Sequence, residues 1–227
     1  MKLKKGVRAL SLLMVLAFLT AMFVPAVSAE NINADKSTQI SDNKLGNFFA
    51  MKSNDVVKAS EVINLVNPKY YQNLTKNQKK EFENLDVFIP DINDPKITMD
   101  FNISAKKKNT DSKGEYYVWA HVTGFVDNAF VWLGIEGVNY LGSQTADIIM
   151  PSMETSATLF HRTNSNWLQE EYITSSSTYW NYDEAMSTMW NPDSGDYRTT
   201  AVIYGVFPAG YEPASYCEVG YSGIISK

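Results

Sequence analysis

Aromatic and polar side chains alternate along two neighbouring segments in the middle of the chain, a combination that suits ligand binding. Residues 115–126 and 129–138 both alternate with period 2, and Asp127-Asn128 between them predicts a two-residue hairpin turn. With this pairing, one side of the hairpin carries aromatic rings together with hydrogen-bonding groups. The members of this side are Tyr117, Trp119, His121, Thr123, Phe125, Phe130, Trp132, Gly134 and Glu136.

The predicted register places Trp119 opposite Glu136 and His121 opposite Gly134. Flat rings can stack on sugar rings while carboxylate and imidazole groups hydrogen-bond the sugar hydroxyls. Two other interpretations stay open. The face could be buried under the second sheet or under the N-terminal helices, or it could contact another protein chain, because aromatic residues are enriched in such interfaces.

A second aromatic cluster follows between residues 167 and 190, interleaved with serine and threonine. Its rings could form a rim carried by loops, or they could close one end of a β-sandwich. We expect Trp180 and Trp190 from this cluster to contribute to binding. The predicted ligand-binding residues are therefore Tyr117, Trp119, His121, Trp132, Glu136, Trp180 and Trp190.

Catalysis is the weaker interpretation of the chemistry-bearing residues, and we predict no catalytic residue. A secreted glycoside hydrolase would need two carboxyl groups facing one cleft, and neighbouring strand residues such as Glu170 and Glu171 point to opposite faces. Cys217 alternates with polar neighbours and is expected to be a small buried residue of a strand. The candidate carboxylates are Glu136, Glu170, Glu171, Asp183, Glu184 and Glu218.

No cofactor is expected from the sequence, and the two histidines and one cysteine do not have zinc-site spacing. Calcium is the one metal worth considering. Oxygen ligands cluster at Asp91, Asn93 and Asp94, and again at Asp193 and Asp196. Neither cluster follows the twelve-residue calcium loop, so plain turns are the alternative.

The N-terminal segment predicts export. Residues 1–29 combine four basic side chains, an apolar run and Ala-Val-Ser-Ala at the end, as a cleaved signal peptide does. The formal net charge of the whole sequence is −5; without the four basic side chains of this segment, 16 basic and 25 acidic side chains give −9. A nucleic-acid partner is not expected, and membrane attachment would occur only through an uncleaved signal segment. A secreted or cell-surface location follows.

Two segments lie between the signal and the main domain. Residues 30–52 are rich in Asn, Asp, Lys and Ser and predict a disordered tether. Residues 53–94 predict a short helical segment with two helices, the first running from Val56 until Asn67-Pro68 ends it. The second begins with the capping box of Thr75 and Gln78.

Residues 95–227 predict an antiparallel β-sandwich of about eight strands, so the fold class is mainly β with two short preceding helices. A helix is considered only at residues 183–190. The predicted function is a secreted or cell-surface binding module for polysaccharide or cell-envelope material; a structural or interaction protein and a hydrolase are the alternatives. Strands are expected near 97–104, 115–126, 129–138, 144–150, 156–162, 167–174, 197–207 and 214–225.

Overall fold

The computed structural model describes residues 43–95 and 100–227. The predicted signal segment 1–29, residues 30–42 of the predicted tether and residues 97–99 of the first predicted strand lie outside the described residues. The helices are α2 (Lys44–Met51), α3 (Ala59–Val66), α4 (Pro68–Asn73) and α5 (Lys76–Asn84). The strands are β1 (Val56–Lys58), β2 (Asp86–Phe88), β3 (Phe101–Asp111), β4 (Gly114–Trp132), β5 (Glu136–Met150), β6 (Ser152–Thr163), β7 (Asn166–Ser177), β8 (Trp180–Trp190), β9 (Asp196–Val206), β10 (Tyr211–Glu212), β11 (Ser215–Tyr221) and β12 (Ile225–Ser226).

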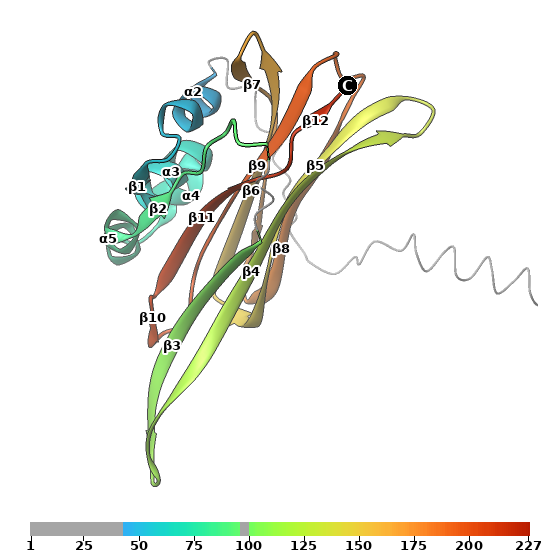
Figure 1. Cartoon of the computed structure of the whole chain (residues 1–227). Coiled ribbons are helices and arrows are strands. Elements are labelled where there is room, and N and C mark those ends of the chain that lie inside the picture. The colour runs from blue at the N-terminus through green and yellow to red at the C-terminus, as the bar shows by residue number, and fades with distance from the viewer. Residues whose placement is uncertain (1–42, 96–99) are drawn as a thin grey trace, which may run out of the picture. The chain divides into compact units, whose positions relative to one another are not determined.

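Two antiparallel sheets form a sandwich (Figure 1). The outer sheet has the strand order β10-β3-β4-β5-β8, and the inner sheet has the order β11-β9-β6-β7, with β12 beside β9. A separate two-stranded pair, β1-β2, belongs to the helical segment. Eight of the described strands have seven or more residues. The prediction of a mainly β antiparallel sandwich preceded by short helices is confirmed.

Apolar side chains cover the inner sheet on both sides. On one side, Phe49, Ile63 and Phe82 of the helices pack with β-strand residues such as Val202 and Tyr204. On the other side, residues of both sheets meet, among them Val122, Tyr140, Met150, Met153 and Leu159. Because both of its faces are covered, β9 is buried along almost its whole length. The outer sheet has only its inward side covered in this way.

The predicted hairpin turn at Asp127-Asn128 is wrong, because β4 runs through these residues without interruption. Asn128 is buried, its side chain donates a hydrogen bond to the carbonyl oxygen of Tyr197 (3.3 Å), and its backbone pairs with Tyr140. The turn lies instead around Gly134, whose φ of +78° is easily adopted by glycine. The predicted strands 115–126 and 129–138 are therefore parts of β4 and the start of β5.

The segment before the sandwich also differs from the sequence-based expectation. Residues 44–51 of the predicted tether form α2. The helix expected from Val56 begins only at Ala59, since Val56–Lys58 pairs as β1 with β2. The capping box of Thr75 and Gln78 is confirmed at the start of α5. Residues 183–190, considered as a helix, belong to strand β8.

Candidate functional site

The outward side of the outer sheet carries exposed aromatic rings, and we call it the aromatic face. Odd-numbered residues of β4 point outward while Ala120, Val122 and Val126 are buried, so Tyr117, Trp119 and His121 share this side. Trp119 is 53% exposed, which excludes the interpretation that the ring lies in the core. The exposed large apolar side chains of this face on β4 and β8 are Tyr117, Trp119, Phe125, Tyr182, Met186 and Trp190.

Strand pairing shows how these rings are distributed. Trp119 pairs with Lys106 of β3, and Tyr182 is in the row of Thr145 and Thr123. Trp190 pairs with Gly137, which itself pairs with Val131 near the end of β4. At about 3.3 Å per residue, the rows of Tyr117 and Trp190 are roughly 45 Å apart along the strands. The aromatic face is therefore long, and its rings follow one direction.

Ion pairs and hydrogen bonds fix the polar groups between the rings. The Lys106 ammonium lies 5.3 Å from the ring centroid of Tyr117, within the range of a cation–π contact. His121 donates its backbone N–H to Asp147 (2.8 Å), and its ring Nδ1 lies 2.9 Å from the second carboxylate oxygen of Asp147. Burial acts in the opposite sense, but these contacts with His121 hold the pKa of Asp147 below its usual value.

A second polar contact lies at the β8 side of the face. The Tyr182 hydroxyl donates to the Glu184 carboxylate at 2.5 Å. Burial and then this neighbouring carboxylate raise the pKa of Tyr182. The face thus presents phenol, carboxylate, imidazole and ammonium groups in held positions, all of which can exchange hydrogen bonds with a polyhydroxylated ligand.

Trp132 and Glu136 do not lie on the aromatic face. Because β4 is unbroken, Trp132 is an odd number of residues from Trp119 and points to the opposite side of the sheet. The predicted pairs of Trp119 with Glu136 and of His121 with Gly134 are wrong for the same reason. Glu136 pairs with Trp132 itself, and His121 pairs with Ser104.

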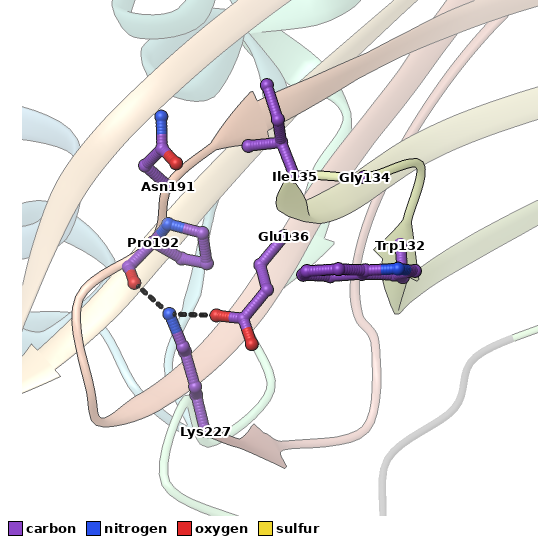
Figure 2. A pocket seen from close by; sticks show the side chains of 7 residues that line it. All are labelled: Trp132, Gly134, Ile135, Glu136, Asn191, Pro192 and Lys227. Carbon is purple, nitrogen blue, oxygen red and sulfur yellow. Dashed lines mark hydrogen bonds and ion pairs between the residues drawn. The ribbon is translucent and has the colours of Figure 1, made fainter.

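Trp132 and Glu136 instead line an open cavity of about 470 Å³ at the β4–β5 turn (Figure 2). Lys227 reaches into it, with its ammonium 2.6 Å from a carboxylate oxygen of Glu136 and 2.5 Å from the carbonyl oxygen of Pro192. The Trp132 ring lies next to this ion pair in Figure 2. The remaining lining residues are Gly134, Ile135 and Asn191.

The second aromatic cluster is divided by the fold. Trp167 and Tyr172 pack with the helices against the inner sheet, where the Trp167 indole donates to Asn93 (3.0 Å). Trp180 is exposed at the first residue of β8, next to a break in the β5–β8 register. Trp190 lies on the aromatic face. The predicted rim is therefore not one continuous feature.

Five of the six candidate carboxylates of a hydrolase have separate partners, and burial raises the pKa of the sixth, Glu218. Asp183 is buried between the sheets and accepts a hydrogen bond from Ser175 (2.8 Å), and burial raises its pKa to about 6. Glu170 lies 3.3 Å from the ring of His161, and Glu171 accepts a hydrogen bond from the Tyr140 hydroxyl (3.0 Å). Glu136 and Glu184 have the partners given above.

Cys217 is buried in β11, as the alternation predicts, and burial raises the pKa of its thiol well above the usual value.

The oxygens of the two calcium candidates accept hydrogen bonds from protein groups. Asp91 accepts from the backbone of Asn93 (2.9 Å), and the carbonyl oxygen of Asp94 accepts from the buried Arg198 (2.5 Å). Asp196 accepts from Arg162 and Ser226. Within residues 43–95 and 100–227, no three His, Cys, Asp or Glu side chains come together as metal ligands would. These segments are organised by their own hydrogen bonds.

Several residues of these surfaces escaped the sequence-based prediction. Lys227 and Asn191 are far from Glu136 in sequence, and only the pairing of β8 and β12 with their neighbours brings them to the cavity. Met186 is not among the residues that the sequence predicts for binding. The sequence does contain the period-2 alternation of a strand in this segment. The residues that alternate with smaller or inward ones are Tyr182, Glu184, Met186, Thr188 and Trp190.

Among the described helices, none has the length and apolar character needed to span a bilayer. Comparison with protein-family models, with curated proteins and with solved structures finds no match for this chain.

Proposed function

We propose that this protein is a secreted or cell-surface binding module that holds a linear polysaccharide of the cell envelope along its aromatic face. The observation that supports the proposal is the row of half-exposed rings on a sheet side that no described element covers. Indole and phenol rings stack on the apolar faces of sugars, and the polar groups between them complement hydroxyls. The length of the face suits an extended polymer better than a single sugar.

The interaction-protein alternative has one specific observation in its favour. Met186 pairs with Leu141, and Phe125 lies in the neighbouring row, so an apolar stretch interrupts the polar groups of the aromatic face. Apolar and aromatic residues of this kind are enriched at protein interfaces. The experiment below therefore measures self-association beside polysaccharide binding.

Replacing Trp119 by alanine should weaken polysaccharide binding about tenfold or more, because a central stacking ring of a binding surface contributes roughly 1–3 kcal/mol or more when truncated. Trp132→Ala is the matched control, since it removes another exposed tryptophan ring (69% exposed, against 53% for Trp119) from the opposite side of the same strand. Depletion assays with insoluble peptidoglycan, chitin and cellulose measure the binding.

Both variants should keep the parent's unfolding midpoint, because both rings are exposed. Equal retention by Trp119→Ala and the parent would contradict the proposal. Absence of binding to every polysaccharide, together with self-association in sedimentation velocity that Met186→Glu abolishes, would favour the interaction protein instead.

A further inference from the structure

The end of β4 and the turn that follows it carry three large, exposed apolar side chains. We call residues 132–135 the hairpin tip. Leu133 is 79% exposed, and Trp132 and Ile135 are also exposed. Turns usually carry polar residues or glycine, and only Gly134 fits that rule here. In Figure 1 the β4–β5 hairpin extends beyond the strands next to it, so the tip is sterically free to meet a surface.

The cavity at the base of the tip contains one group of each charge. Glu136 and Lys227 form the ion pair described above, and the Asn191 backbone N–H donates to the carbonyl oxygen of Glu136 (2.9 Å). In Figure 2 the Asn191 amide points away from this ion pair, so the polar groups beside the Trp132 ring are those of Glu136 and Lys227. The indole of Trp132 forms an apolar wall beside these groups (Figure 2).

This combination fits a zwitterionic phospholipid headgroup. A quaternary or primary ammonium is attracted both by the Glu136 carboxylate and by the face of an indole. A phosphate accepts charge-assisted hydrogen bonds from an ammonium, which Lys227 supplies. The net charge of −5 disfavours anionic lipid surfaces. The cavity therefore matches a headgroup that carries both charges.

The hairpin tip matches the layer next to the headgroup. Tryptophan is enriched at membrane interfaces, and leucine and isoleucine gain from transfer to the acyl region. A protein partner fits less well, since stable complexes bury about 800 Å² on each side, more than a four-residue turn presents. We propose that the hairpin tip docks on a bilayer surface, with a phosphocholine or phosphoethanolamine headgroup in the Trp132–Glu136–Lys227 cavity and Leu133 in the acyl region.

Sedimentation of the protein with phosphatidylcholine and phosphatidylglycerol vesicles tests this proposal. The parent should bind phosphatidylcholine vesicles, and Leu133→Ser should weaken that binding about tenfold, because one buried leucine is lost. Met51→Ser is the matched control, since Met51 is also 79% exposed but lies on α2. It should bind like the parent. Trp132→Ala should also lose binding, and free phosphocholine should compete with the vesicles for the parent.

Three results would overturn the proposal: no binding of the parent to phosphatidylcholine, equal binding by Leu133→Ser, or a preference for phosphatidylglycerol that salt abolishes. The proposal does not depend on polysaccharide binding, because the cavity and the aromatic face lie on opposite sides of β4. Leu133→Ser should keep full polysaccharide retention, so failure of one proposal leaves the other open to its own test.

Discussion

Glu154→Gln should stabilise the protein at neutral and alkaline pH. Glu154 lies on β6 and is only 5% exposed. Burial, followed by the nearby Asp183, raises its pKa to about 9 from an ordinary value of 4.5. Its carboxyl group has no ion pair or hydrogen bond to another described residue, and the hydroxyl group of Tyr172 nearby lacks a hydrogen-bond partner among the described residues. A neutral side chain at this position removes the energetic cost of burying a charge.

The direction of the pH dependence follows from how many protons the folded and the unfolded chain bind. Between about pH 4.5 and 9 the folded chain keeps the Glu154 proton that the unfolded chain releases, so the free energy of unfolding falls as pH rises. One pKa unit corresponds to about 1.4 kcal/mol, so the parent loses roughly 3 kcal/mol by pH 7. Glutamine does not ionise. The variant should gain roughly that amount at pH 7 and less than about 1 kcal/mol at pH 5.

Urea unfolding at pH 5, 7 and 9 measures this difference. Glu81→Gln is the control, since Glu81 is exposed on α5 and its replacement should change the free energy of unfolding by less than about 0.5 kcal/mol. A gain of the same size at all three pH values, or a loss at pH 9, would show that Glu154 is not a buried neutral acid.

Phe49→Ala should destabilise the protein by about 3–5 kcal/mol, the usual cost of truncating a fully buried phenylalanine. Phe49 lies on α2, has no exposed surface, and meets Phe160 and Tyr221 edge to face with ring centroids 6.3 and 6.1 Å apart. The result tests whether α2, in a segment whose composition predicts a tether, is part of the core.

Chemical denaturation with Met51→Ala as control measures the effect. Met51 is on the same helix but exposed, so its replacement should change stability by less than about 0.5 kcal/mol. If Phe49→Ala lowers the free energy of unfolding as little as Met51→Ala does, α2 does not contribute to the folded core.

The helix α2 shows why composition alone wrongly predicted a disordered tether here. Leu45 and Phe49 are four residues apart and face the core together, but the polar residues around them dominate the composition. Asn43 occupies the N-cap position, where asparagine is a favoured residue, but its side chain does not cap the helix. Its side chain instead bonds the carbonyl oxygen of Trp167 and the N–H of Gln169 on β7. Local sequence contains no trace of that tertiary contact.

The wrong prediction of a turn at Asp127-Asn128, within β4, has a different physical cause. Asp-Asn between two alternating segments is a reasonable turn signal, and β4 with 19 residues is far longer than the usual strand. The inward pattern of Val122, Val126 and Asn128 nevertheless continues through the supposed turn. Pairing with β3 and β5 over this length outweighs the local preference. One misplaced turn was enough to put Trp132 on the wrong side.

The predicted aromatic residues are thus partly brought together. Tyr117, Trp119 and His121 share a face because they lie within one regular stretch of alternation, which the sequence displays directly. Trp190 joins them through the pairing of β5 with β8, which depends on long-range register. Whether any sheet side is covered depends on the packing of whole layers, so exposure of the aromatic face could be learned only from the fold.

Oxidative footprinting can show whether a polysaccharide lies along the aromatic face. The protein is exposed to hydroxyl radicals alone and saturated with the polysaccharide it retains, and mass spectrometry measures modification of each exposed ring. We expect the polysaccharide to protect Tyr117, Trp119, Tyr182 and Trp190 while Trp132 is modified as before. Unchanged modification of the aromatic face, or protection confined to Trp132, would contradict the proposed function.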